Sequence, residues 1–324
     1  VFFGGGTPSL LTASQIQQIM DTLRQQFPLS ATAEISLEAN PATFTRDQLW
    51  GYQGAGINRL SLGVQAFQDP LLDLCGRGHT VADIEGAIAE IRAAGITNLN
   101  LDLISGLPQQ TLADWHETLH RAIAHQPEHI SVYDLTIEPG TAFGKRYRPD
   151  HGPLPSEELT VTFYRHAHDL LTTHGYHHYE ISNYARPGYL CQHNLRYWRN
   201  QDFYGVGMGA TSYLQRQRCD RPRQLRAYET WVQHYPHPTP PLTTAEILFE
   251  RFMEGLRLAE GLNLSQLTQE FPPAWVLAMG DRLHAFTPKG WVETQGDRVR
   301  LTIPNGWLFA DTVIAALYDT YHGF

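Results

Sequence analysis

The chain opens with "VFFGGGTPSLL", residues 1–11, in which a short apolar run leads straight into three glycines, a threonine and a proline. The apolar run is typical of a strand, and glycines after a strand expose backbone N–H and C=O groups to a close ligand. The loop lacks the Gly-Lys-Ser/Thr of a phosphate-binding loop and the glycine spacing of a dinucleotide fingerprint. Taken alone, it predicts a tight turn. Because the sequence starts inside a strand and without a methionine, we expect a piece of a longer protein.

Strand-like and helix-like segments alternate from this loop to about residue 200. Thr12 with Gln15, and Thr45 with Gln48, have the spacing of capping boxes at two helix starts. Repeated β-α units with right-handed connections predict an α/β fold with a parallel sheet or barrel and helices outside it. The patterns predict parallel strands near residues 1–3, 34–38, 59–64, 98–104, 130–136 and 178–182.

Polar residues collect where these strands end. The segments "GGGT", "EAN", "GVQ" and "LDL" occupy corresponding positions after four of them. In α/β barrels and open parallel sheets, the carboxyl ends of the strands share one edge, and sites are built there. The pattern therefore predicts one shared site.

The pattern changes after about residue 200. A proline-rich stretch, "HYPHPTPPLTT" at 234–244, predicts a connector. Helical segments at 245–261 and 263–271 follow, then a hairpin around "GD" at 290–302 and a last helix at 307–321. We expect a barrel over 1–200, a connector over 201–241 and a C-terminal domain over 242–324 that resembles a winged helix.

Composition narrows the class of protein. The net charge of −9 argues against a nucleic-acid partner, because a surface that follows phosphates is usually basic. No apolar run has the length of a transmembrane segment. The three cysteines, Cys75, Cys191 and Cys219, form no disulfide framework and suit a reducing compartment. We expect a cytoplasmic protein.

The ordered motifs "GGGTPS", "LEANP", "RLSLGVQ" with "GRGHT", "LDLISGLP" and "SVYDLTIEPGT" resemble the radical S-adenosylmethionine family, in the branch of oxygen-independent coproporphyrinogen III oxidase-like proteins. The resemblance implies a partial (β/α)6 barrel with a smaller C-terminal α+β domain. It also implies S-adenosylmethionine and a [4Fe-4S] cluster held by a Cys-x3-Cys-x2-Cys loop after the first strand. That loop is absent from this sequence, and the three cysteines are too far apart to replace it. We expect the cluster ligands to lie N-terminal to Val1.

The resemblance assigns S-adenosylmethionine to residues at the strand ends. Gly5, Gly6 and Thr7 would meet the methionine part, whose ammonium needs carbonyl acceptors. Arg77 would pair with the ligand carboxylate, for which a guanidinium fork is well shaped. Side chains on later strands would contact the other groups: Glu38 the ribose hydroxyls or the ammonium, Gln65 and Asp102 the same hydroxyls, and Thr136 the adenine.

A second motif, "HNLRY" at 193–197, bears on the ligand. The family includes a sister group of heme chaperones with a His-Asn-x-x-Tyr motif, which His193, Asn194 and Tyr197 match. A neutral imidazole is a good axial ligand for heme iron, and Tyr197 and Trp198 offer flat apolar faces. The nearest candidates for the propionates are Arg186, Arg196 and Arg199. The rival metal ligands are His174, His177 and His178, although strand alternation sends the last two to opposite faces.

Two functions remain open. The first is a chaperone that binds heme and transfers it to an acceptor protein. The second is an enzyme that decarboxylates coproporphyrinogen III to protoporphyrinogen IX without oxygen, for which no catalytic residue is identified. Both need an electron donor, the cluster and S-adenosylmethionine, and they differ in whether the porphyrin is cargo or substrate. A nucleic-acid-binding winged helix is a third and weaker alternative, because the chain is acidic.

Overall fold

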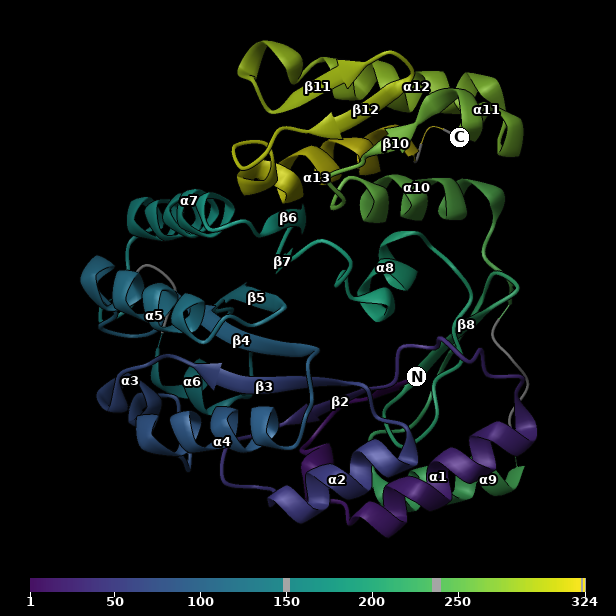
Figure 1. Ribbon diagram of the computed structural model, residues 1–324. Helices are drawn as coiled ribbons and strands as arrows, with labels where there is room; N and C mark the ends of the chain where they lie inside the picture. Colours follow the sequence, from purple (N-terminus) through teal and green to yellow (C-terminus); the bar gives the residue numbers. More distant parts are fainter. Residues whose placement is uncertain (148–151, 235–239, 322, 324) are drawn as a thin grey trace. The chain divides into compact units, whose positions relative to one another are not determined.

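The computed structural model describes residues 1–147, 152–234, 240–321 and 323, and these form two compact units, Val1–His193 and Asn194–Phe324 (Figure 1). The first unit is built on a seven-stranded sheet with the order β1-β2-β3-β4-β5-β7-β6. In chain order its strands are β1 Phe2–Phe3, β2 Ser36–Ala39, β3 Arg59–Gln65, β4 Leu99–Ser105, β5 His129–Asp134, β6 His177–Glu180 and β7 Asn183–Ala185.

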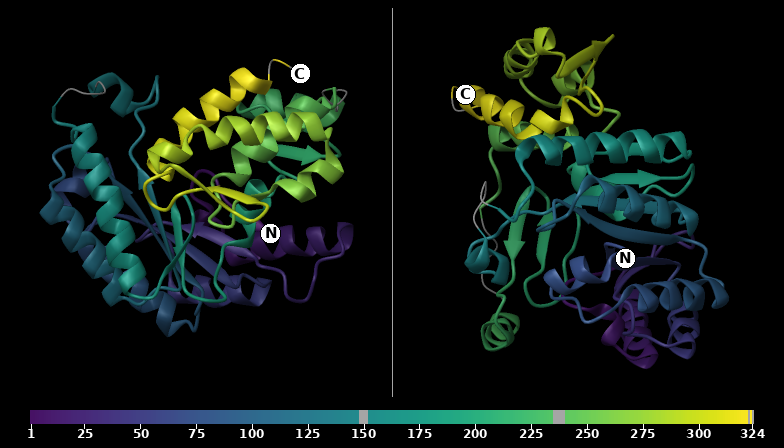
Figure 2. Two further views of the ribbon diagram at one scale, coloured as in Figure 1. Left: turned by 90° about the horizontal axis from the view of Figure 1, so that it is seen from above. Right: turned by 90° about the vertical axis from the view of Figure 1, so that its left-hand side faces the viewer.

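Strands β1 to β5 are parallel, which confirms the predicted α/β architecture. The connecting helices lie along the outside of this sheet (Figures 1 and 2). Both predicted capping boxes form, at Thr12 and at Thr45. The helices are α1 Ala13–Gln26, α2 Arg46–Ala55, α3 Asp69–Leu74, α4 Val81–Ala93, α5 Leu112–Ala124, α6 Ala142–Arg146 and α7 Glu157–Thr173.

The last part of the sheet differs from the prediction. The strand predicted near 178–182 is β6, which runs in the direction of β1 to β5, but the chain reverses after Glu180, and β7 inserts antiparallel between β5 and β6. The reversal is local, because only Ile181 and Ser182 separate the two strands, and the Ser182 N–H donates to the Glu180 carboxylate at 3.2 Å. A two-residue connection joins antiparallel strands, whereas a parallel pair needs a crossover of a dozen residues or more.

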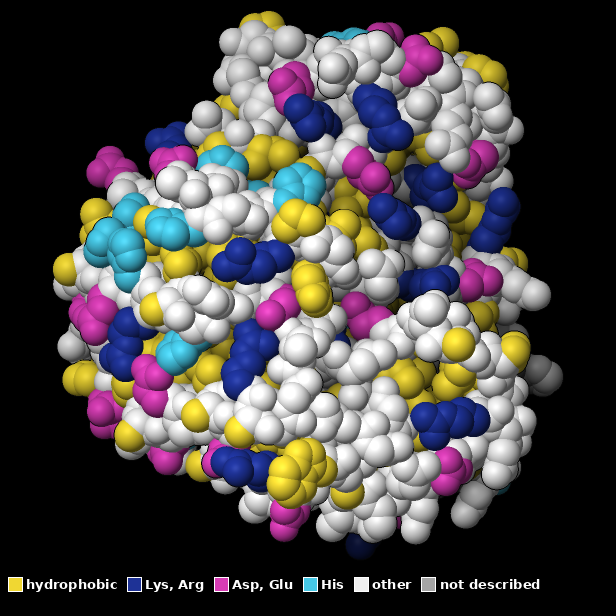
Figure 3. Space-filling view, viewed as in Figure 1, with side chains coloured by type: hydrophobic (Ala, Val, Ile, Leu, Met, Phe, Trp, Pro, Cys, Tyr) yellow, Lys and Arg dark blue, Asp and Glu magenta, His cyan; other side chains and the backbone are white. Residues whose placement is uncertain are grey.

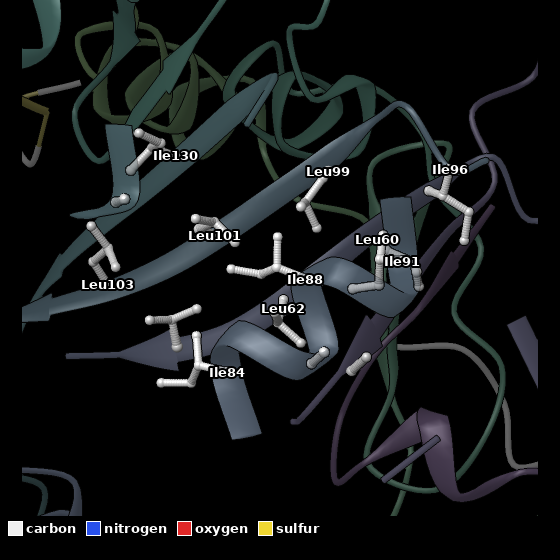
Figure 4. Packing of buried hydrophobic residues seen from close by; sticks show 14 of the residues in the cluster. Leu60, Leu62, Ile84, Ile88, Ile91, Ile96, Leu99, Leu101, Leu103 and Ile130 are labelled. Carbon is white, nitrogen blue, oxygen red and sulfur yellow. The ribbon is translucent and has the colours of Figure 1, made fainter. Parts of the chain in front are cut away.

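The helices and the sheet bury one apolar core. Leu60 and Leu62 of β3 pack with Leu101 of β4 against Ile84 and Ile88 of α4 (Figure 4). All five side chains are at most 4% exposed. One face of the sheet is therefore fixed against the helices.

The second unit carries the C-terminal elements. A three-stranded sheet of order β10-β12-β11 includes the predicted hairpin, whose turn places Gly296 at φ +59°. Helix α12 and strand β10 were not anticipated. The elements from here to the end of the chain are α10 Thr244–Gly255, β10 Leu262–Asn263, α11 Leu264–Glu270, α12 Pro273–His284, β11 Val292–Gln295, β12 Arg298–Leu301 and α13 Ala310–Tyr321.

The stretch expected as a connector, 201–241, contains ordered elements. Strands β8 (Thr211–Leu214) and β9 (Gln217–Asp220) form a hairpin, and helix α9 (Leu225–His234) follows. Residues 235–239 of the proline-rich stretch lie outside the described residues. Helix α8 (Gln192–Trp198) spans the boundary between the two units. None of the helices in the described part of the chain is long and apolar enough to cross a membrane.

Replacing Leu62 by alanine tests the packing of the first unit. Leu62 is 0% exposed. The substitution leaves a cavity under α4, and we expect the free energy of unfolding in urea to fall by about 2–5 kcal/mol. The control is Leu10→Ala, because Leu10 is 68% exposed; its effect should stay within about 0.5 kcal/mol. Equal effects of the two substitutions would contradict this packing.

Candidate functional site

The inner face of the sheet is polar. Side chains alternate along a strand, so Leu60 and Leu62 face the helices while Arg59, Ser61 and Gly63 face the other way. Register aligns polar residues of neighbouring strands in rows across this inner face. One row is Glu38, Ser61, Asn100 and His129, and the next is Gly63, Asp102 and Ser131.

A cavity of about 180 Å³ opens at the carboxyl ends of the first four strands. Six of the eight residues predicted to contact the cofactor line it: Gly6, Thr7, Glu38, Gln65, Arg77 and Asp102. Gly5 adjoins it through its N–H, which donates to a Glu38 carboxylate oxygen at 3.1 Å. Thr136 is exposed beyond the end of β5 and is not among the lining residues.

The backbone around the cavity explains its glycines. Gly5 and Gly6 have φ of +79° and +64°, a conformation that glycine adopts without strain. Gly63 faces the cavity, and a Cβ there would lie 2.7 Å from Asn40 Oδ1 and 2.9 Å from Gln65 Nε2. A register shift between Gly63 and Gln65 places Gln65 at φ +70°, which is unusual for a residue with a side chain. The loop and the strand end thus leave room for a ligand.

Two carboxylates and one guanidinium define the charge of the cavity. Burial raises the pKa of Glu38, and the Gly5 N–H opposes that shift. Burial also raises the pKa of Asp102, whose carboxylate accepts a hydrogen bond from the Ser61 hydroxyl at 2.8 Å. Arg77 Nη1 donates to Asn40 Oδ1 at 3.4 Å.

This donor set suits a zwitterion with hydroxyl groups. Carboxylates accept hydrogen bonds from an ammonium or from ribose hydroxyls, and a guanidinium binds a carboxylate. These are the polar groups of S-adenosylmethionine, so the residues present fit that cofactor. Sequence reasoning missed Asn40, Ser61 and Gly63, although Ser61 and Gly63 precede Gln65 at intervals of two and so share its face of β3.

A buried network continues from Asp102 toward β5. The Asn100 amide Nδ2 donates to Asp102 Oδ1 at 2.7 Å, and His129 Nδ1 lies 2.6 Å from Asn100 Oδ1. Because a carbonyl oxygen only accepts, Nδ1 carries the proton, and His129 Nε2 accepts from the Tyr179 hydroxyl at 2.8 Å. Burial holds the pKa of His129 well below its usual range, in keeping with this neutral form. The Cys191 N–H donates to Tyr179 at 3.3 Å.

His193 lies at the end of the first unit. Its ring stacks on Phe2, with centroids 3.9 Å apart and planes at 7°. Its backbone N–H donates to the Glu34 carboxylate at 3.1 Å. Burial is the main cause that lowers the pKa of His193 to about 4, followed by the charge of the amino group at Val1 and that of Arg59.

The other two residues of the motif, Asn194 and Tyr197, belong to the second unit, as does Trp198, which follows the motif. Tyr197 packs edge-on against Phe203, with ring centroids 4.5 Å apart. Trp198 lies beneath the Arg257 guanidinium, 5.5 Å from its ring centroid. Each unit therefore contributes part of the "HNLRY" segment.

Among the described residues, the remaining histidines and cysteines form no group that could hold a metal ion. His177 is exposed and His178 is buried, as alternation predicts. The Nδ1 atoms of His178 and His168 are 2.9 Å apart. Other histidines gather on the surface over α5 and α7 (Figure 3), where His116 and His166 are hydrogen-bonded at 2.9 Å.

An iron–sulfur cluster does not fit the residues present. Within the described ranges, no group of three or more His, Cys, Asp or Glu side chains could hold a metal ion. Cys75, Cys191 and Cys219 form no disulfide: Cys75 follows α3, Cys191 precedes α8 and Cys219 lies in β9.

Comparison with known proteins identifies the family. Residues 1–122 match the Radical SAM superfamily, and residues 242–309 match the HemN C-terminal domain. The heme chaperone HemW of Synechocystis sp. is 49% identical over 82% of this chain and 66% of its own length. HemW of Bacillus subtilis is 34% identical over 84% of this chain and 73% of its own length.

A solved structure extends the likeness to the fold. Coproporphyrinogen III oxidase (HemN) from Escherichia coli, a radical SAM enzyme, superposes with a TM-score of 0.83 at 25% identity, over 98% of this chain and 76% of the enzyme. The chain spans 66%, 54% and 55% of HemW from Synechocystis sp., Escherichia coli and Haemophilus influenzae. The chain belongs to the radical SAM superfamily and, within it, to the family of the heme chaperone HemW.

Proposed function

We propose that this protein binds heme and transfers it to an acceptor protein. The observation that carries the proposal is the identity of 34–49% to proteins named heme chaperone HemW, in a chain that has His193, Asn194 and Tyr197 at the positions of the His-Asn-x-x-Tyr motif. An electron donor and a heme acceptor are its proposed partners, and the cytoplasm its proposed location. The ligands of a [4Fe-4S] cluster are proposed to precede Val1.

The cavity at the strand ends is the proposed S-adenosylmethionine site. When bound with a reduced cluster, this cofactor supplies a 5′-deoxyadenosyl radical. Glu38 and Asp102 accept hydrogen bonds from the ammonium and the ribose hydroxyls, with Gln65 beside them. Arg77 binds the carboxylate. The backbone of Gly5, Gly6 and Thr7 surrounds the methionine part, and Thr136, which lies outside the lining of this cavity, stays the proposed contact of the adenine.

His193 is the proposed axial ligand of heme iron. An imidazole binds iron only through an unprotonated nitrogen. The low pKa of His193 keeps the ring neutral at physiological pH. Asn194 and Tyr197 are proposed to complete the heme site.

A second candidate is oxygen-independent coproporphyrinogen III oxidase. The observation that favours it is the superposition on that enzyme, which extends over both units of the chain. In this reading the protein oxidatively decarboxylates two propionate side chains to vinyl groups. The porphyrin would be a substrate that leaves changed, whereas a chaperone releases it unchanged.

Replacing Arg77 by alanine tests the cofactor site. Loss of a charge-assisted pair with the ligand carboxylate should weaken S-adenosylmethionine binding by about ten- to a hundredfold, measured by calorimetry on the full chain with its cluster rebuilt. The control is Arg46→Ala, because Arg46 pairs at the surface with Glu90 at 2.7 Å and should leave the affinity unchanged. Equal affinities of the Arg77→Ala variant and the parent would reject this role.

Replacing His193 by alanine tests the heme ligand. The Soret band of bound heme should disappear or shift, while the affinity for S-adenosylmethionine stays the same. His174→Ala is the matched control, since His174 is exposed and bonded to the Leu170 carbonyl. If the His193→Ala variant shows the parent's spectrum and heme affinity, another residue is the ligand.

The low pKa of His193 also predicts a pH dependence. An ordinary histidine protonates near pH 6.5, but burial, the largest cause of the shift, should keep this ring neutral well below that pH in the full chain. Heme ligation should therefore survive a titration from pH 7.5 to pH 5, followed by the Soret band with circular dichroism as the check on folding. Loss of ligation centred near pH 6.5 in a folded protein would contradict the assignment.

A further inference from the structure

Arg59 is a buried cation that forms no direct ion pair with a described residue, although its charge acts on the Asp102 carboxyl and opposes the rise that burial causes in the pKa of that group. It is the first residue of β3, faces the inner side of the sheet and is 2% exposed. Its Nη1 donates to the Ser36 hydroxyl at 3.0 Å. Its Nε is buried and has no hydrogen-bond partner, and within the described residues no ion pair includes this side chain.

The unused side of this guanidinium has a defined shape. Nε and Nη2 lie on one edge of the guanidinium and carry two parallel N–H groups, which is the geometry that binds both oxygens of a carboxylate. Ser36 occupies Nη1 on the other side and so holds the fork in place. Burying a guanidinium N–H without an acceptor is costly, so an anionic acceptor at this edge would be stabilised by two charge-assisted hydrogen bonds.

The sheet register places Arg59 near His193. Phe2 of β1 pairs with Ser36 of β2, and Ser36 pairs with Arg59 of β3. Neighbouring strands are about 4.8 Å apart, so the backbones of Phe2 and Arg59 are separated by roughly 10 Å. The ring of Phe2 stacks on His193, and the charge of Arg59 contributes to the low pKa of that histidine.

The three arginines that lie near His193 in sequence and were candidates for the propionates either have other partners or belong to the second unit. Arg186 donates to the Pro127 carbonyl at 3.3 Å and lies over the Tyr176 ring, 4.7 Å from its centroid. Arg199, in the second unit, pairs with Glu260 at 3.1 Å. Arg196 is an exposed residue of the second unit. Arg59 differs from them in being buried with an Nε–H that has no hydrogen-bond acceptor.

We infer that Arg59 is a carboxylate-binding residue whose Nε–Nη2 edge holds a propionate of the heme that His193 ligates. The inference rests on the proposed function. The propionates lie on the rim of the porphyrin, several ångströms from the iron, so one heme can contact both residues. The same chemistry would accept the carboxylate of S-adenosylmethionine, and the experiment separates these two sources.

The test compares heme with its dimethyl ester, in which both propionates are blocked. Each is titrated by absorbance into the full chain, as parent, Arg59→Gln and Arg59→Lys. We expect the parent to prefer heme over the diester by about ten- to a hundredfold, as for a desolvated charge-assisted pair. Arg59→Gln should lose most of this preference while its diester affinity changes less than about twofold. Arg59→Lys keeps the buried charge but lacks the fork, and it should also lose most of the preference.

The matched control is Arg46→Gln, which makes the same change of charge at the surface and should keep the preference. A parent without preference, or an unchanged preference in folded Arg59 variants, would overturn the inference. Weaker S-adenosylmethionine binding in Arg59→Gln, with heme binding intact, would also overturn it by assigning the fork to the other carboxylate. A parent that binds neither heme nor the diester would instead refute the proposed function.

Discussion

The division of one sheet into an apolar and a polar face is the constraint on which the rest of this structure depends. The outer face packs against helices through Leu60, Leu62 and Leu101. A shift of one residue would turn these side chains to the other face, so their burial fixes the register of the strands. Parallel strands are usually apolar on both faces. Here the inner face consists of hydroxyl, amide, imidazole and charged groups, and such groups must find partners in each other or in a ligand.

The partners differ from row to row along the inner face. Asn100, His129 and Tyr179 form a continuous buried chain of hydrogen bonds with one another. Toward the carboxyl ends, burial raises the pKa values of Glu38 and Asp102, which disfavours the charged forms until a cationic or hydroxyl-bearing ligand arrives. Toward the amino ends, the Arg59 guanidinium is a donor whose Nε–H has no acceptor. A ligand that carries hydroxyls and an ammonium suits one end, and one that carries a carboxylate suits the other.

Local patterns predicted the parallel strands and the two capping boxes, because these depend on residues a few positions apart. They also predicted the cavity, because the carboxyl ends of parallel strands meet at one edge of the sheet. Sequence could not predict the insertion of β7, which depends on pairing with β5, over fifty residues earlier in the chain. Arg59 reads in sequence as an ordinary charge at the start of a strand, and only its burial beside Ser36 makes it unusual. Thr136 was assigned from order along the chain, and β5 ends before bringing it to the cavity.

The most direct test of this account asks whether the porphyrin leaves the protein changed. The full chain with its cluster rebuilt would be given coproporphyrinogen III, S-adenosylmethionine and a reductant without oxygen, and the products analysed by mass spectrometry. In parallel, the heme-loaded protein would be mixed with apomyoglobin and the transfer followed by absorbance. The account predicts heme transfer and no vinyl product. Formation of protoporphyrinogen IX by a protein that binds no heme would contradict it.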